Sequence, residues 1–171
     1  MPTLSWVSLV PLPTAGMRLV LVHLPDWRQV LTQLLSALKP GGWLVDEEFD
    51  SDSLAADPNL GTGEALLPTH VGMGGLMAGS GFDRRCGRRL FARLRQAGFV
   101  DVEAEGSVFM VQRGSPGAAL LRANYEQLRG TLVEKGYVND DQVTVDLARL
   151  NEADFVMPSS IMWTACGRRP E

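Results

Sequence analysis

The sequence predicts an α/β protein built around a layered sheet. Three observations predict this class: amphipathic helical segments alternate with short apolar runs, a Pro-Gly-Gly turn joins the first helix to the first such run, and 45% of the 171 residues are hydrophobic. Helices that alternate with short apolar strands are typical of a sheet covered by helices. The length fits one domain of ordinary size or part of a larger one.

The first regular segment is a helix that begins after Asp26. Apolar side chains over residues 27–38 recur at the spacing of one helical face. Asp26 is a suitable N-cap, and the Lys-Pro-Gly-Gly sequence at 39–42 ends the helix. The apolar run at 43–45 is then typical of a buried strand. Three acidic residues stand at its carboxyl end: Asp46, Glu47 and Glu48.

The later segments continue the alternation of helix and strand. In chain order we expect a loop at 50–63, a loose glycine-rich helix at 64–80, a helix at 84–97, a half-buried strand at 99–104, a helix at 116–135, a helix from Asp140 or Asp141 to about 151, and a strand at 161–166. In the helix at 84–97, Leu90, Phe91 and Leu94 are predicted to face inward. Its basic side chains are predicted to form a solvated face: Arg84, Arg85, Arg88, Arg89, Arg93 and Arg95.

Composition disfavours several classes of function. The 16 Lys and Arg residues are outnumbered by 20 Asp and Glu, so neither nucleic acid nor an anionic membrane is an expected partner. The longest uncharged run, residues 1–17, contains three prolines and cannot span a bilayer, and it lacks the basic start of a secretory signal. Two isolated cysteines and two isolated histidines predict no metal site. A cytoplasmic location follows as the expectation.

Four segments carry a resemblance to a known family. They are residues 18–26 (Arg-Leu-Val-Leu-Val-His-Leu-Pro-Asp), 38–45 (Leu-Lys-Pro-Gly-Gly-Trp-Leu-Val), 96–102 (Gln-Ala-Gly-Phe-Val-Asp-Val) and 155–164 (Phe-Val-Met-Pro-Ser-Ser-Ile-Met-Trp-Thr). In this order they resemble class I methyltransferases that use S-adenosylmethionine and act on small molecules. The resemblance covers about residues 17–169.

The resemblance implies a Rossmann-like sheet of seven strands, with the cofactor over the carboxyl ends of the first four and the last strand in the interior. The family's glycine-rich turn after the first strand, and its acid after the second, have no counterpart here. We therefore expect a partial sheet: strands five to seven, their flanking helices and a helical lid insertion. Residues 1–16 would be an atypical N-terminal segment, and 17–171 the C-terminal portion of a methyltransferase domain. Transfer of a methyl group to a small-molecule acceptor would be impaired in such a chain.

Two candidate residues follow from the connection that comes after the fourth strand in the family. Arg18 would lie near the methionine end of S-adenosylmethionine, where a guanidinium pairs well with a carboxylate. The alternative is a surface arginine at a sheet edge. His23 would face the methyl acceptor and serve as a catalytic general base. The alternative is a histidine packed beside the following helix.

Three further residues are candidates for binding the substrate. Glu47 and Glu48 end a strand whose carboxyl end faces the substrate pocket in the family. Strand alternation sends their side chains to opposite faces, so only one of them is expected to point inward. His70 lies in the expected lid and is either a substrate contact or an exposed side chain.

The glycines at 72–79 superficially resemble a cofactor loop. They fail the G-x-G-x-x-G pattern because Met77 stands at the third glycine position, and no strand precedes them. We interpret them as part of the lid, where glycine permits close packing.

Two functions of other classes stay open. A sheet without its first strands has an unpaired edge, which favours a noncatalytic interaction module that associates with itself. Alternatively, residues 4–10 supply a substitute edge strand in a small binding protein, since they are rich in β-branched and aromatic side chains.

Overall fold

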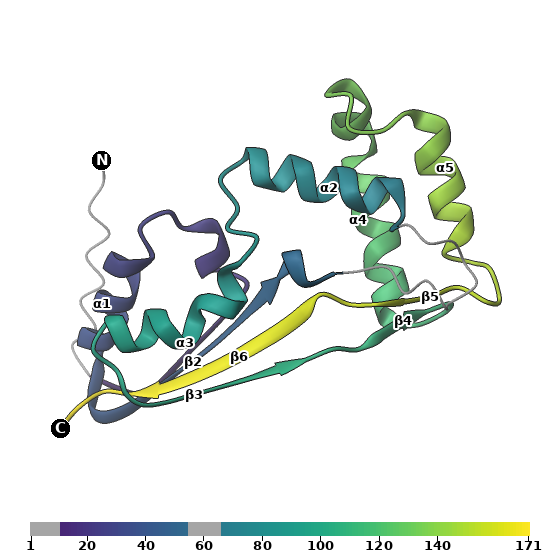
Figure 1. Cartoon of the computed structure of the whole chain (residues 1–171). Helices are drawn as coiled ribbons and strands as arrows, with labels where there is room; N and C mark the ends of the chain where they lie inside the picture. Colours follow the sequence, from purple (N-terminus) through teal and green to yellow (C-terminus); the bar gives the residue numbers. More distant parts are fainter. Residues whose placement is uncertain (1–10, 55–65) are drawn as a thin grey trace. The chain divides into compact units, whose positions relative to one another are not determined.

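A computed structural model describes residues 11–54 and 66–171 of the chain (Figure 1). The described residues form two units, each with its own internal contacts. The sheet unit comprises residues 11–49, 85–106 and 162–171, and the helical unit comprises residues 50–54, 66–84 and 107–161. Each unit is described by itself.

Four strands form the main sheet in the order β1-β2-β6-β3. Their bounds are Leu12–Arg18 for β1, Leu38–Asp50 for β2, Val100–Ser107 for β3 and Ile161–Arg168 for β6. β1 and β2 are parallel, and helix α1 (Trp27–Ala37) connects them. The arrow of β6 runs opposite to those of its two neighbours (Figure 1). This mixed arrangement confirms the predicted α/β class.

Strand β1 was not expected, because prolines 11 and 13 suggested a broken segment. The structure accommodates Pro13 at an irregularity of pairing, where the register with β2 shifts between Leu12 and Thr14. Proline is tolerated at such a bulge of an edge strand because the missing N–H is not needed there. The proposed substitute strand at 4–10 lies outside the described residues. The expected boundary between 16 and 17 stays a prediction, although β1 runs across it.

Strand β2 is longer than the apolar run that predicted it. It begins at Leu38, directly after α1, and includes the Lys-Pro-Gly-Gly turn, in which Gly41 has a φ of +72°. Left-handed backbone of this kind suits glycine. Leu44, Asp46 and Glu48 are buried, whereas Trp43 and Val45 of the alternate face are exposed. One face of the strand is therefore covered and the other is open within the described residues.

Helix α3 (Cys86–Gln96) covers the buried face of β2. A Cβ atom at Gly87 would lie 2.5 Å from the carbonyl oxygen of Glu48, so the helix backbone approaches the strand directly. Leu90 and Leu94 are fully buried, as predicted. The prediction was wrong for Phe91, which is 42% exposed, because its position falls to the side of the inner stripe. Arg93, expected in the solvated face, is only 8% exposed.

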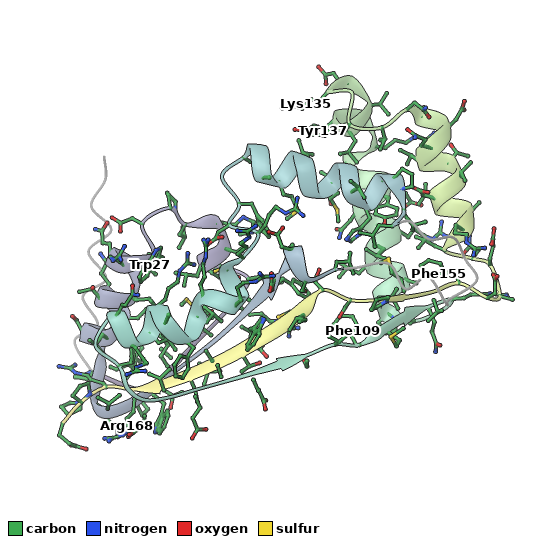
Figure 2. The ribbon with its side chains drawn as sticks, in the orientation of Figure 1. Trp27, Phe109, Lys135, Tyr137, Phe155 and Arg168 are labelled. Atoms are coloured by element: carbon green, nitrogen blue, oxygen red, sulfur yellow. The ribbon has the colours of Figure 1, made fainter. Side chains whose placement is uncertain are left out.

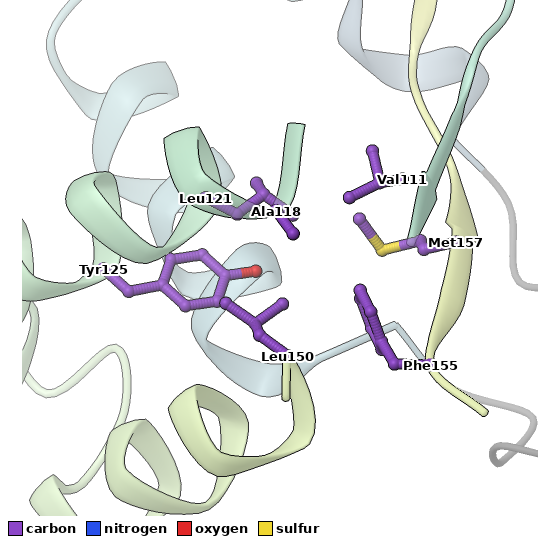
Figure 3. Close-up of a cluster of buried hydrophobic side chains, with 7 residues drawn as sticks. All are labelled: Val111, Ala118, Leu121, Tyr125, Leu150, Phe155 and Met157. Carbon is purple, nitrogen blue, oxygen red and sulfur yellow. The ribbon is translucent and has the colours of Figure 1, made fainter. Parts of the chain in front are cut away.

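The helical unit contains α2 (Pro68–Gly79), α4 (Pro116–Glu134) and α5 (Asp140–Arg149). α4 and α5 confirm the predicted helices at 116–135 and 140–151, and α2 confirms the helix predicted at 64–80 from Pro68 onward. Most of the expected loop at 50–63 lies outside the described residues. Two short strands, β4 (Met110–Gln112) and β5 (Val156–Pro158), pair antiparallel. They were not predicted, since three residues carry too little periodicity. One buried hydrophobic cluster of the unit (Figure 3) comprises Val111, Ala118, Leu121, Tyr125, Leu150, Phe155 and Met157.

The glycines of α2 serve close packing within the helical unit. A Cβ atom at Gly72 would lie 3.1 Å from Cγ1 of Val138, and one at Gly75 would lie 2.9 Å from Cε1 of Tyr137. Tyr137 is labelled in Figure 2. A larger residue at either position would meet these side chains, so the glycines are explained by helix packing.

Candidate functional site

The carboxyl ends of β1 and β2 bring two predicted site residues together. Arg18 and Glu47 are register partners, and Nε of Arg18 lies 3.6 Å from Oε2 of Glu47. The hydroxyl of Thr164, on β6, donates to the other Glu47 oxygen at 3.1 Å. The Arg18 side chain remains 66% exposed. An exposed guanidinium at this strand end is available to an anionic group from solution.

Glu48 points to the opposite face, as the alternation of the strand predicted. Its Oε1 accepts the backbone N–H groups of Val20, Leu21 and Val22 at 2.9, 2.6 and 3.3 Å. These amides begin the short 3-10 helix η1 (Leu21–His23), which has no side-chain cap of its own. Burial raises the pKa of Glu48, and the three amides oppose that shift. The carboxylate thus holds the connection after β1, and its predicted role in binding substrate stays a prediction.

Asp46 is a fully buried carboxyl on the same face as Glu48. Neither of its oxygens has a hydrogen-bond partner of ordinary geometry among the described residues. Burial, followed by the charge of Glu48, raises the pKa of Asp46 to about 8, and the nearby charge of Arg93 opposes the shift. The sheet unit therefore contains a buried carboxyl group whose pKa lies well above its ordinary value. Sequence reasoning placed Asp46 at the strand end without assigning it a role.

Arg93 brings a cation beneath this strand. Its Nη1 donates to the Cys86 thiol sulfur at 3.1 Å, and its guanidinium lies 5.0 Å from the centre of the Trp27 ring. Trp27, labelled in Figure 2, begins α1 next to its N-cap Asp26. The missed signal is spacing, because Arg93 follows Cys86 by seven residues and Leu90 by three and so shares their inner helical face.

His23, the predicted general base, ends η1 and is exposed. The amides that Glu48 holds immediately precede it in the chain. The sheet unit thus gathers Arg18, His23, Glu47 and Glu48 around one connection, from Arg18 to η1. Their roles in catalysis and in cofactor or substrate binding stay predictions.

His70, the remaining predicted substrate contact, belongs to the helical unit. Its ring centre lies 6.4 Å from that of Tyr125, with the planes inclined by 67°. Burial and then the charge of Arg84 lower the pKa of His70. On the preceding residue, the backbone N–H of Thr69 donates to Oδ2 of the buried Asp146 at 2.7 Å. Three helices therefore bring polar groups into the interior of this unit.

The helical unit also has a surface groove of about 240 Å³. It lies along the first half of α4 and the end of α5, and Arg122 crosses it to donate to Oδ1 of Asn151 at 2.8 Å. The small side chains of Ala118, Ala119 and Ala123 line it. Its charged groups already contact one another, since Arg122 also pairs with Glu126 at 3.7 Å.

Two further structural findings bear on the class of site. Within residues 11–54 and 66–171, no group of three or more His, Cys, Asp or Glu side chains could hold a metal ion. In the same part of the chain, none of the helices has the length and apolar character required to cross a membrane.

Comparison with known proteins gives matches among solved structures. No family model matches the chain, and no curated protein matches it. Phosphoethanolamine N-methyltransferase 2 of Haemonchus contortus, in complex with phosphomonomethylethanolamine and S-adenosylhomocysteine, is 13% identical over 93% of this chain and 34% of its own, with a TM-score of 0.47. The same enzyme with S-adenosyl-L-methionine gives 15% identity over 93% of this chain and 33% of its own, with a TM-score of 0.46.

A third structure is the arsenic(III) S-adenosylmethionine methyltransferase of Chlamydomonas reinhardtii, 16% identical over 93% of this chain and 37% of its own, with a TM-score of 0.38. All three structures are of methyltransferases. The chain spans about a third of the length of each of them.

Proposed function

We propose that this chain takes part in S-adenosylmethionine-dependent methyl transfer to a small-molecule acceptor. The observation that carries the proposal is the position of β6, the last strand, between β2 and β3. The sequence resemblance implied an interior last strand, whereas consecutive strands more often lie next to each other. Three of the four resembling segments also fall on connected parts of the sheet unit: the end of β1 with η1, the turn into β2 and the turn into β3.

The residues present suit one end of the cofactor. Arg18 offers an exposed guanidinium that can hold the carboxylate of the methionine part. When bound, S-adenosylmethionine supplies a methyl group activated by its sulfonium. His23 is exposed and can accept the proton that the acceptor loses as it takes up that methyl group. Glu47 keeps Arg18 at the strand end, and Glu48 fixes the backbone that leads to His23. Work of this kind on a small molecule fits the cytoplasmic location that the sequence predicts.

Calorimetric titration with S-adenosylhomocysteine tests the proposal. We expect micromolar binding by the folded chain, and about tenfold weaker binding for Arg18→Met, because the variant loses a charge-assisted contact. Arg89→Met is a suitable control, since Arg89 is an exposed arginine of α3. Absence of binding to a folded sample would refute cofactor binding by this chain. Equal loss in both arginine variants would refute the role of Arg18.

A second candidate is a noncatalytic module that associates with itself through β1. The backbone N–H of Leu19 donates to the Glu47 carbonyl at 2.8 Å, so residue 19 faces β2. By alternation, the backbone groups of Thr14, Gly16 and Arg18 face away from β2. No described strand lies on that side. An unpaired edge of this kind can pair with the same edge of a second copy.

Sedimentation velocity over a range of concentrations tests the second candidate. Gly16→Pro removes one outward N–H while leaving the groups that face β2 in place. A dimer that Gly16→Pro abolishes would support pairing through β1. A monomer at every concentration, or a dimer unchanged by the substitution, would refute it. Circular dichroism of both proteins confirms that the variant is folded.

A further inference from the structure

Four polar side chains converge in the interior of the helical unit. Thr69 and His70 come from α2, Tyr125 from α4 and Asp146 from α5. Thr69 and Tyr125 are fully buried, and Asp146 is only 3% exposed. The three helices contact one another pairwise. The cluster therefore belongs to one unit and is independent of the connection after β1.

Asp146 is an acid without a matching cation. Its Oδ2 accepts the Thr69 backbone N–H at 2.7 Å, which satisfies one orphan amide at the start of α2. Among the described residues, no Lys, Arg or His side chain forms an ion pair with Asp146. A buried carboxylate normally needs both hydrogen bonds and an opposite charge. The described residues of the helical unit give Asp146 a hydrogen bond but no side chain of opposite charge.

The neighbouring groups have unused hydrogen-bonding capacity. The Tyr125 hydroxyl, the Thr69 hydroxyl and Nδ1 of His70 are all buried without a hydrogen-bond partner within the described residues. Burial and then the charge of Asp146 raise the pKa of Tyr125. Unsatisfied buried polar atoms are uncommon in folded proteins, and several in one place call for a specific explanation.

His70 does not supply the missing positive charge. Burial and the nearby charge of Arg84 lower its pKa, so the imidazole is neutral at neutral pH. A neutral imidazole offers an acceptor or a donor but no counter-ion. No described side chain therefore supplies a positive charge to Asp146.

We propose that Asp146, Tyr125 and Thr69 form a site for a primary amine with an apolar body. An ammonium group has three donors, which match the Asp146 carboxylate and the oxygens of the two hydroxyls. The apolar part of the ligand would contact the cluster to which Tyr125 belongs, including Leu150 (Figure 3). Binding of the amine does not require the proposed methyl transfer.

The test uses the full chain without cofactor and 2-phenylethylamine as the probe. Calorimetry should show binding of this amine but not of 2-phenylethanol, which has the same body without the charge. Asp146→Asn should weaken binding at least tenfold, because the buried charge of the site is lost. Asp141→Asn, an exposed acid of the same helix, should bind as the unchanged chain does. Tyr125→Phe should weaken binding about fivefold through loss of one hydrogen bond.

Histidine resonances provide a second readout if Asp146→Asn fails to fold. The chain has two histidines, and His23 belongs to the sheet unit. The amine should shift the ring resonances of His70 and leave those of His23 in place. No binding of the amine to the folded chain, equal binding of the alcohol, or equal shifts at both histidines would overturn the proposal. Titration with S-adenosylhomocysteine is measured separately, so failure of the amine site is distinguishable from failure of the proposed methyl transfer.

Discussion

Asp46→Asn should change how the stability of the sheet unit depends on pH. Asn has nearly the same volume as Asp but cannot ionise. In the folded chain the pKa of Asp46 is raised from 3.8 to about 8, chiefly by burial. Between these two values the folded state keeps a proton that the unfolded state has lost. Because the unfolded state then binds fewer protons, the free energy of unfolding falls as pH rises through this window.

The magnitude follows from the same linkage. One proton of difference corresponds to about 1.4 kcal/mol per pH unit. Between pH 5 and pH 7 the free energy of unfolding of the unchanged chain should therefore fall by about 3 kcal/mol relative to that of Asp46→Asn. The neighbouring carboxyl of Glu48, whose pKa is also raised, titrates in the same direction and remains in both proteins. The difference between the two proteins therefore isolates the contribution of Asp46 and its coupling to Glu48.

Urea denaturation followed by tryptophan fluorescence at several pH values is the appropriate assay. Trp27, Trp43 and Trp163 all lie in the sheet unit, so their emission reports the unit that contains Asp46. Asp141→Asn is the matched control: this acid is exposed on α5, and its removal should give a difference that is flat with pH. A difference between the two proteins that is flat with pH, or a free energy of unfolding that rises with pH for the unchanged chain relative to Asp46→Asn, would refute the reasoning and would mean that Asp46 is ionised in the folded chain.

Two further pairs of substitutions test the packing and the polar contacts. Gly87→Ala should lower the free energy of unfolding by about 3 kcal/mol, because its Cβ would lie 2.5 Å from the carbonyl oxygen of Glu48. Gly130→Ala, whose Cβ would have no atom within 4 Å, should raise it by up to about 1 kcal/mol. Thermal unfolding followed by circular dichroism compares them, and equal effects would contradict the packing. Glu48→Ala should lower the free energy of unfolding by about 3 kcal/mol, because three backbone amides lose their acceptor. Glu47→Ala should lower it by less than about 1 kcal/mol, because the Glu47 side chain is partly exposed. Similar urea midpoints for these two variants would show that the η1 contacts contribute little.

The predictable parts of the fold are those encoded by local periodicity. The helix after Asp26 and the final strand follow from residue spacing alone, and both are confirmed. β1 was missed because its pairing with β2 depends on a distant partner, and only that partner makes Pro13 acceptable. Arg93 was assigned to solvent by residue type, although its helical position is internal. In each case the tertiary environment outweighed a local preference.

Some residues of the candidate sites could likewise be predicted from local sequence, and others depend on tertiary contacts. Strand alternation separated Glu47 from Glu48, because it needs no knowledge of neighbours. The polar cluster of the helical unit could not be predicted, since its members are spread from Thr69 to Asp146 with no common motif. The sequence indicated His70 only through its place in the expected lid. The convergence of three helices gives that residue its neighbours, and convergence is a property of the fold rather than of any segment.

The helices differ in which side chains cap their N-termini. α1, α4 and α5 are capped locally by Asp26, Ser115 and Asn139, with Asn139 standing one residue before the predicted start. In contrast, η1 and α2 have no side-chain cap of their own. A carboxylate from another element satisfies their first amides instead: Glu48 of β2 for η1 and Asp146 of α5 for α2.

Both histidines of the chain lie on these two segments. Locally capped helices keep their ends fixed whatever surrounds them, whereas η1 and α2 depend on a single distant carboxylate each. Loss of Glu48 should therefore displace His23 without affecting His70, and loss of Asp146 should do the reverse. Histidine resonances of Glu48→Ala and Asp146→Ala distinguish the two effects, because neither variant keeps a side-chain acceptor at that position. Movement of both resonances in either variant would show that the two units respond as one, and would contradict an independent role for each carboxylate.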